Sequence, residues 1–299
     1  MNNIENITSK LQFKTNRFLN QMQHGKLQKQ SIQLLQRNKQ AHQQAITSLY
    51  IRPNCELVSA SVDRFVRVWL PVDSVYTLKC ETRLSSVPLL IDQCYIFTSD
   101  GKVYDQFTLE LLFDLKLPIK QITQQYVFVS QFSVYQFNST NTPDFLFKLD
   151  VRVSHIASST DLVAVSSSSQ IYIYNKKNQA LLPPFISNNN KGVSKLLFLS
   201  PNQLISCGFD SSVIVFSVNE AKVKAELTIY VGQRIETAFV IKGDLIVSLS
   251  DGIIKFYSIN ELQQSRITYQ KGNVVTSIIV ENGSGAIGDS EGEIELFEM

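Results

Sequence analysis

The sequence lacks the features that mark membrane-spanning, disulfide-rich and fibrous proteins. In 299 residues, no uninterrupted run of apolar residues exceeds four, so no segment is long enough to cross a bilayer as a helix. The 4 cysteines are too few and too scattered for a disulfide framework, and 12 Gly with 8 Pro exclude a collagen-like chain. The start, Met1–Glu5, lacks the apolar core of a secretory signal. We therefore expect an intracellular protein of the cytoplasm or nucleus, without a membrane span.

Residue sets that carry catalysis or bind metals are also missing. No two of the cysteines form a Cys-x-x-Cys pair, and the 3 histidines add no zinc-ligand spacing. The segment Gly283–Gly288 matches the dinucleotide pattern Gly-x-Gly-x-x-Gly, but only 11 residues follow it. That leaves no room for the helix and distal acid that the fingerprint requires. We expect neither a metal nor a cofactor, and we do not expect an enzyme.

Positive charge is concentrated at the N-terminus. Residues 1–40 hold seven Lys and Arg against one Glu, a charge of +6, whereas the whole chain has +2 and the remaining residues therefore −4. The same 40 residues contain 14 Asn and Gln. This composition predicts a basic, Asn/Gln-rich arm over residues 1–30, ahead of a domain over residues 31–299.

The arm has apolar residues at helical spacings of three, four, seven and four: Ile4, Ile7, Leu11, Phe18 and Met22. Gly25 follows and suits a helix end. We expect an amphipathic helix at about 4–24. It could pack against the domain or remain a partly disordered tail, dock onto a protein, or contact RNA or an anionic membrane. A charge of +6 over 40 residues is not a dense basic patch.

After residue 40 the sequence repeats. Short alternating strands, the first of them Phe65–Trp69, close on an aromatic residue seven times. The closing aromatics are Trp69, Tyr104, Tyr135, Tyr174, Phe216, Tyr257 and Phe297. Their separations are 35, 31, 39, 42, 41 and 40 residues. Four short strands per unit at such a period are typical of the blades of a β-propeller.

Other residues keep the same phase. An acidic residue lies six positions before the aromatic in four units: Asp63, Asp210, Asp251 and Glu291. Each follows a predicted strand, such as Leu57–Ser61 or Leu204–Gly208, that is itself preceded by reverse-turn residues. We interpret the acids as turn residues that accept backbone or serine hydrogen bonds.

The segment from His42 to Trp69 resembles a WD40 repeat. His42 precedes the first strand, Ser59 and Ser61 lie on the second, Asp63 lies in the next turn and Trp69 on the third strand. Residues 193–216 and 235–257 are similar to the same repeat, with an aromatic in the tryptophan position. The resemblance implies an all-β, seven-bladed propeller in which these five side chains form a hydrogen-bonded structural network. Only the first unit has the full set, so we expect most other blades to rely on packing.

The last unit has three predicted strands, because only two residues follow Phe297. The segment Ser31–Gln36 lies one strand ahead of His42 and is placed to supply the fourth. We predict that residues of about 31–36 pair with the strand ending at Phe297 and close the ring.

Four residues are candidates for an interaction face, because loops on a rigid scaffold are where binding residues concentrate. Arg64 and Phe209 adjoin turn acids, and Lys191 and Arg234 precede strands at what should be the same face. Phe209 has two interpretations. An aromatic in a turn suits an interface anchor, but large apolar residues also pack between blades.

These observations lead to three hypotheses of function. The first is a non-catalytic WD40-like scaffold, a monomeric propeller that binds other proteins within a multi-protein complex. The second is a ribonucleoprotein component whose basic arm contacts RNA. The third is a membrane-coat or lipid-binding propeller, which ranks last because the phosphoinositide motif Phe-Arg-Arg-Gly is missing.

Overall fold

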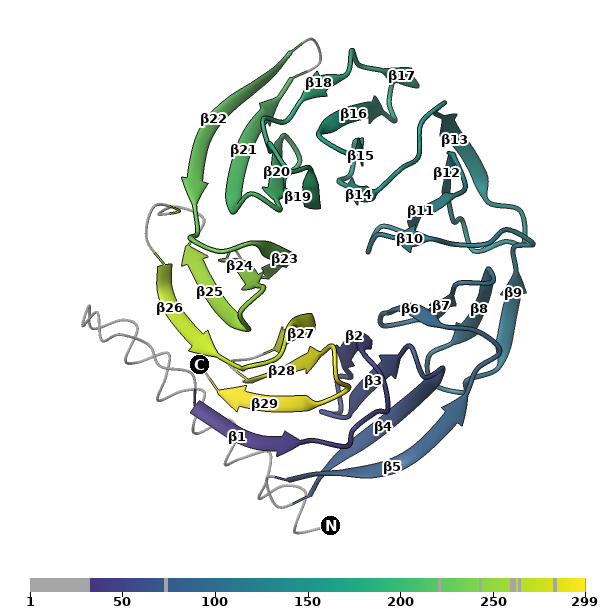
Figure 1. Ribbon diagram of the computed structural model, residues 1–299. Coiled ribbons are helices and arrows are strands. Elements are labelled where there is room, and N and C mark those ends of the chain that lie inside the picture. Colours follow the sequence, from purple (N-terminus) through teal and green to yellow (C-terminus); the bar gives the residue numbers. More distant parts are fainter. Residues whose placement is uncertain are drawn as a thin grey trace.

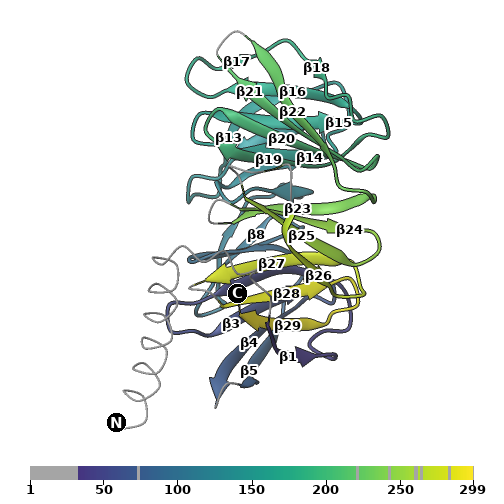
Figure 2. The same cartoon turned by 90° about the vertical axis from the view of Figure 1, so that its left-hand side faces the viewer.

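The computed structural model describes residues 33–72, 75–219, 222–241, 244–258, 262, 265–281 and 284–298. These residues form seven antiparallel sheets, arranged as blades around a central opening (Figure 1). Seen edge-on, the blades make up a thick disc (Figure 2). No helix occurs in this part of the chain. The arm predicted over residues 1–30, and the helix predicted within it at about 4–24, lie outside the described residues.

Each blade runs from an inner strand at the central opening to an outer strand at the rim. Blade 1 consists of β2 (Ile46–Ile51), β3 (Leu57–Ser61), β4 (Phe65–Val72) and β5 (Val75–Arg83). Blade 2 consists of β6 (Pro88–Ile91), β7 (Tyr95–Thr98), β8 (Lys102–Asp105) and β9 (Leu111–Asp114). Blade 3 consists of β10 (Gln121–Ile122), β11 (Val127–Ser130), β12 (Ser133–Gln136) and β13 (Asp144–Lys148). Blade 4 consists of β14 (His155–Ser158), β15 (Leu162–Ser167), β16 (Gln170–Asn175), β17 (Ala180–Leu181) and β18 (Phe185–Ile186).

Strands of five to eight residues make up blades 5 to 7. Blade 5 consists of β19 (Val193–Ser200), β20 (Gln203–Gly208), β21 (Ser212–Val218) and β22 (Val223–Tyr230). Blade 6 consists of β23 (Ile235–Ile241), β24 (Asp244–Leu249), β25 (Ile253–Ser258) and β26 (Ser265–Gln270). Blade 7 consists of β27 (Val275–Glu281), β28 (Ser284–Asp289), β29 (Ile294–Glu298) and, from the other end of the chain, β1 (Gln33–Asn38).

The repeat in the sequence is the repeat of the blades. Each closing aromatic lies on the third strand of its own blade: Trp69 on β4, Tyr104 on β8, Tyr135 on β12, Tyr174 on β16, Phe216 on β21, Tyr257 on β25 and Phe297 on β29. The seven-bladed, all-β prediction is therefore confirmed.

Blade 7 combines strands from two distant parts of the chain. β1 pairs antiparallel with β29, with Gln33 opposite Glu298 and Arg37 opposite Glu295, and the two strands lie side by side in Figure 1. The sequence predicted a strand paired here at about 31–36, and β1 spans Gln33–Asn38, shifted toward the loop that leads into blade 1.

The core is divided into clusters that lie between neighbouring blades. At the junction of blades 7 and 1, Leu57 and Trp69 pack with Ile294 and Leu296. At the junction of blades 2 and 3, ring edges meet ring faces: the Phe137 centroid lies 5.2 Å from that of Phe97, 5.5 Å from that of Tyr95 and 5.4 Å from that of Phe113. Blades with short strands are thus joined by aromatic packing.

Candidate functional site

The blade 1 loops are held by a chain of side-chain hydrogen bonds. The Trp69 Nε1–H donates to Ser59 Oγ at 2.8 Å, and Ser59 Oγ lies 2.8 Å from His42 Nε2. His42 Nδ1 lies 3.0 Å from the Asp63 carboxylate. Because the carboxylate can only accept, Nδ1 carries the proton, and Nε2 accepts from the Ser59 hydroxyl. One tautomer of a neutral histidine satisfies every member of the network.

Ser61 takes part in a different way. Its hydroxyl donates to the backbone oxygen of Gln44 at 2.8 Å and accepts from the backbone N–H of Asp63 at 3.1 Å. It therefore ties the strand end to the loop before β2 and does not bond to the other four side chains. Of the five residues predicted for the network, the structure links four directly and places Ser61 beside them.

Burial sets the protonation of this network. It lowers the pKa of His42 to about 4, although the Asp63 carboxylate acts in the opposite direction. Burial alone would raise the pKa of Asp63, but hydrogen bonds from the backbone N–H of Phe65 and Gln43, together with His42, hold that pKa below its usual range. Near pH 7, His42 is neutral, buried and fully hydrogen-bonded, which is a structural role and not that of a general base.

Blade 5 builds an equivalent network that sequence reasoning missed. Asn189 replaces the histidine: its Oδ1 accepts from the Ser206 hydroxyl, and its Nδ2 donates to Ser212 Oγ at 2.7 Å. The Ser212 hydroxyl in turn donates to Asp210. Ser206 follows Asn189 by 17 residues, as Ser59 follows His42. That shared spacing was the available signal, and blade 5 is thus not one of the blades that rely on packing.

The turn held by this network carries Phe209, which is half-buried and contacts a second predicted residue. The Arg234 guanidinium carbon lies 4.8 Å from the centroid of the Phe209 ring. Arg234 precedes β23, and the exposed fraction of its side chain is 56%. Phe209 is therefore neither fully buried between blades nor isolated at the surface. Its ring contacts the guanidinium of the exposed Arg234.

The other two predicted residues lie in loops of the same kind. Lys191 is exposed, and the backbone oxygen of the following Gly192 accepts from Phe209 N–H at 3.1 Å, so the Lys191 loop adjoins the Phe209 turn. Arg64 belongs to blade 1 and is half-buried, in a left-handed conformation with φ of 71°. The structure thus brings together Lys191, Phe209 and Arg234, and it leaves Arg64 in the equivalent turn of another blade.

Tyr230 joins this group and was not predicted. It ends β22, pairs with Ser212 across the sheet and exposes 74% of its surface. The next residue, Val231, donates its N–H to the backbone oxygen of Ser211 at 3.0 Å, beside the Phe209 turn. We call Lys191, Phe209, Tyr230 and Arg234 the blade 5–6 corner.

Comparisons with known proteins agree with this geometry. Residues 33–69 match the family model described as the WD domain, G-beta repeat, which spans β1 to the Trp69 of β4. The crystal structure of the WD40 β-propeller domain of Doa1 is similar, with a TM-score of 0.69, 14% identity, and coverage of 90% of this chain and 97% of that one. The fold is a WD40-type β-propeller. A crystal structure of the computationally designed protein Ika8 is also similar, with a TM-score of 0.63, 17% identity, and coverage of 87% of this chain and 98% of that one. No curated protein matches the chain in sequence.

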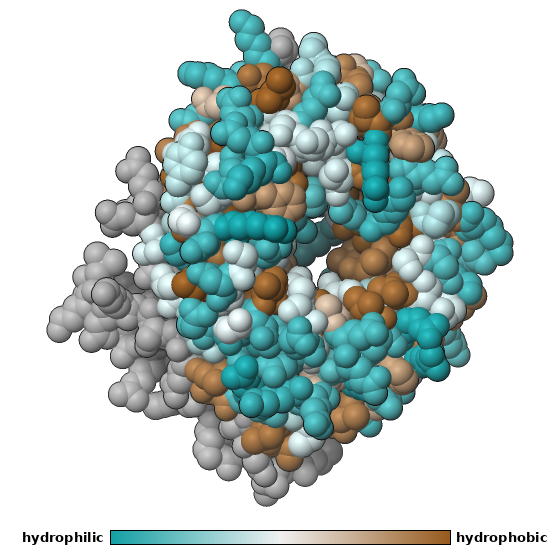
Figure 3. All heavy atoms as spheres, in the orientation of Figure 1, coloured by the Kyte–Doolittle hydropathy of each residue, from teal (hydrophilic) through white to brown (hydrophobic). Residues whose placement is uncertain are grey.

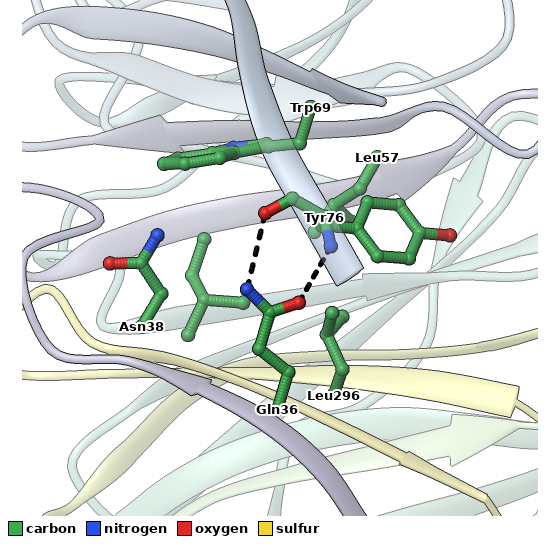
Figure 4. A pocket seen from close by; sticks show the side chains of 7 residues that line it. Gln36, Asn38, Leu57, Trp69, Tyr76 and Leu296 are labelled. Atoms are coloured by element: carbon green, nitrogen blue, oxygen red, sulfur yellow. Dashed lines mark hydrogen bonds between the residues drawn. The ribbon is translucent and has the colours of Figure 1, made fainter. Parts of the chain in front are cut away.

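The seam between blades 7 and 1 of the WD40-type propeller holds a small pocket. Gln36 of β1 reaches across it to Tyr76 of β5, as Figure 4 shows: its amide oxygen accepts from Tyr76 N–H at 2.7 Å, and its amide nitrogen donates to Tyr76 O at 3.1 Å. Leu57, Trp69 and Leu296 form apolar walls. The amide of Gln36 takes the place of a backbone group and joins β1 of blade 7 to β5 of blade 1.

Ion pairs hold charged residues at blade 7, and they range from the exposed Arg37 to the fully buried Lys271. Arg37 of β1 lies 2.8 Å from Glu293 and 3.2 Å from Glu295. Lys271, whose side chain has no exposed surface, lies 3.4 Å from Glu295 and 3.1 Å from Asp289. Asp289, and not the exposed Glu291 predicted as the turn acid of this unit, accepts the backbone bonds of the turn.

The propeller face in Figure 3 is largely hydrophilic, and apolar side chains gather beside the channel opening over β6 and β10. In the part of the chain that the structure describes, no three His, Cys, Asp or Glu side chains are grouped to hold a metal ion. The described residues also include no helix long and apolar enough to cross a membrane.

Proposed function

We propose that this WD40-type propeller is a non-catalytic scaffold that binds other proteins in a multi-protein complex through the blade 5–6 corner. The observation that carries the proposal is the contact of Arg234 with Phe209, because a stacked and partly exposed arginine is a typical anchor of protein interfaces. Exposed Tyr230 and Lys191 beside it extend the surface.

The scaffold beneath this corner is rigid, which favours binding. Asn189, Ser206 and Ser212 are all fully or almost fully buried and bond to one another or to Asp210. Loops fixed in this way lose little conformational entropy when a partner docks. The histidines also favour a non-catalytic role, since His42 is committed to the blade 1 network and burial lowers the pKa of His155 to about 4.

We further propose that pairing of β1 with β29 stabilises the ring, and that the basic arm over residues 1–30 extends from this point as a second contact region. Support comes from Arg37, whose ion pairs join β1 to blade 7, and from the net charge of +6 over residues 1–40. Contact of the arm with RNA is the alternative role, and the experiment below separates the two.

Affinity purification with mass spectrometry tests the scaffold. The tagged full-length protein is compared with a deletion of residues 1–32 and with the double variant Phe209→Ala, Arg234→Gln, with and without nuclease. We expect a nuclease-resistant set of proteins that persists in the deletion and is lost in the double variant. Partners that vanish on nuclease treatment would move the function to ribonucleoprotein assembly. A preparation without partners would contradict the scaffold.

A further inference from the structure

We propose that Arg234 is the receptor for a carboxylate on an acidic segment of a partner protein, and that Tyr230 contacts an apolar residue beside that carboxylate. This inference rests on the scaffold function proposed above, and it adds the chemistry of the partner at the blade 5–6 corner.

The Arg234 side chain is held in place with its end groups free. Its guanidinium stacks on Phe209, and its Nε lies 3.0 Å from a Glu236 carboxylate oxygen. Its backbone oxygen accepts from Ser250 N–H at 2.9 Å, which fixes the loop. Among the described residues, Glu236 is the one acidic partner of Arg234, at Nε, and no side-chain hydrogen bond of either Nη is found. Two parallel N–H groups on a fixed guanidinium match the two oxygens of a carboxylate.

The neighbours of Arg234 favour a peptide over a bare anion. Tyr230 presents an aromatic ring with 74% of its surface exposed, at a strand end that adjoins the Phe209 turn. Tyrosine and arginine are the residue types enriched where interfaces have their strongest contacts. Lys191 adds an exposed positive charge in the adjoining loop. An acidic side chain next to an apolar one would meet complementary groups here.

The acidic residues around the corner disfavour a nucleic acid. Glu236 is paired with Arg234, and Asp251, which is exposed, follows directly after the Ser250 that bonds to the Arg234 loop. A nucleic-acid backbone brings a row of phosphates and requires a basic stripe, whereas a single carboxylate requires one free guanidinium. One guanidinium with one exposed lysine nearby suffices for a single carboxylate but not for a row of phosphates.

Selection from a random peptide library displayed on phage tests the proposal with the full-length protein as bait. Selected peptides are then synthesised, and their dissociation constants are measured by fluorescence polarisation. We expect enriched peptides to carry Asp or Glu beside an apolar residue. We expect Arg234→Gln to weaken their binding at least about tenfold, and Arg234→Lys to restore part of it, since lysine keeps the charge but not the paired N–H groups.

Arg152→Gln is the matched control. Arg152 is exposed and directly precedes the buried Val153, just as Arg234 directly precedes the buried Ile235. It has no ion pair among the described residues and no aromatic ring beneath it. Both variants remove one positive charge from an equivalent loop, so general electrostatic attraction would weaken equally in both. We expect Arg152→Gln to change the dissociation constant less than about twofold, and the melting temperatures of all variants to match.

Several results would overturn the inference without overturning the scaffold. The first is that the selected peptides lack acidic residues, and the second is that Arg152→Gln and Arg234→Gln weaken peptide binding equally. The third is that the peptides bind more tightly when phosphoserine replaces the acidic residue. The fourth is that poly(U) RNA displaces the peptides. The inference would also be wrong if the co-purified partners remain bound to the Arg234→Gln variant. The scaffold itself fails if the full-length protein retains no partners in the affinity experiment, or if its partners vanish on nuclease treatment.

Discussion

At the residue scale, the turn between the second and third strands contains a left-handed residue in all seven blades. The residues there are Arg64, Gly101, Gln131, Ser168, Ser211, Gly252 and Gly292, each with a positive φ. A Cβ added to Gly252 would lie 2.6 Å from backbone atoms of Gly272, so the following loop passes too close for a side chain. Gly101 and Gly292 are in the same situation, since an added Cβ would also meet backbone atoms there, and residues other than glycine occupy the other four turns.

We therefore predict opposite effects for two substitutions in this turn. Gly252→Ala should lower the free energy of unfolding by more than about 1 kcal/mol, because it combines a backbone clash with a left-handed alanine. Arg64→Gly should raise it, or leave it within about 0.5 kcal/mol, because it relieves a φ of 71°. Urea denaturation measures both. A loss of stability in Arg64→Gly would mean that the arginine side chain has a structural contact of its own.

Ser59 links two buried side chains of the blade 1 network, so we expect its hydroxyl to contribute to the stability of the protein. Ser59→Ala removes the acceptor of the Trp69 Nε1–H and the donor to His42 Nε2, and both partners are buried. Leaving buried groups unpaired costs about 1–3 kcal/mol, and we expect a loss in that range by urea denaturation. Ser154→Ala, at a half-buried serine in the loop before β14, is the comparison and should have little effect. Equal losses would contradict the network.

Two histidines make stability depend on pH. Burial lowers the pKa of both His42 and His155 from 6.5 to about 4. Because the unfolded chain binds these protons first, the free energy of unfolding rises with pH between about 4 and 6.5, by roughly 3 kcal/mol per histidine. Burial is the largest cause for both; Lys195 also lowers the pKa of His155, and beside His42 the carboxylate of Asp63 raises the pKa while Arg67 lowers it. His155→Gln should lose more stability at pH 7 than at pH 4.5, relative to the unchanged protein. A difference independent of pH would contradict this assignment.

At the element scale, the aromatic cluster between blades 2 and 3 replaces the hydrogen-bonded networks of blades 1 and 5. Phe137 is 3% exposed and contacts Tyr95, Phe97, Phe113 and Tyr126. Phe137→Ala should therefore lower the free energy of unfolding by about 3–5 kcal/mol. Phe145, on the outer strand β13 of the same blade, is 58% exposed, and Phe145→Ala should cost less than about 1 kcal/mol. Thermal and urea unfolding of the two variants compare a core aromatic with a rim aromatic.

Some contacts at this scale could be predicted and others could not. The alternating strands and their aromatics follow from local pattern, which is why all seven third strands are where the sequence places them. The ion pair of Arg37 with Glu293 joins residues 256 positions apart, and no local pattern contains it. Asn189 could have been found from its spacing to Ser206, but a search for histidine alone passes over it. Arg234 and Phe209 were each predicted as surface residues, and only the structure shows that they stack on each other.

At the scale of the whole molecule, the propeller is a ring in which the ends of the described chain meet. Gln33 and Glu298 are partners in one antiparallel pair, so a short hairpin turn could join them. Once the natural ends are joined, new ends can be made by cutting the chain elsewhere. The position of the cut decides whether the two new terminal strands pair within one sheet. β1 is an example, because the other three strands of its sheet come from the opposite end of the described chain.

We predict that a circular permutant joined in this way and opened in the turn between β21 and β22 is nearly as stable as the natural order. The eight-residue strand β22 then becomes the N-terminal outer strand of blade 5 and holds the ring as β1 does in blade 7. The control is a permutant with the same join but opened in the loop between β22 and β23, where no strand crosses the new break. We expect the first to melt within roughly 5 °C of the natural protein and the second roughly 10 °C lower or more, because its new ends are not paired within one sheet. Scanning calorimetry measures both, and equal melting temperatures for the two permutants would show that strand exchange at the seam does not stabilise the ring.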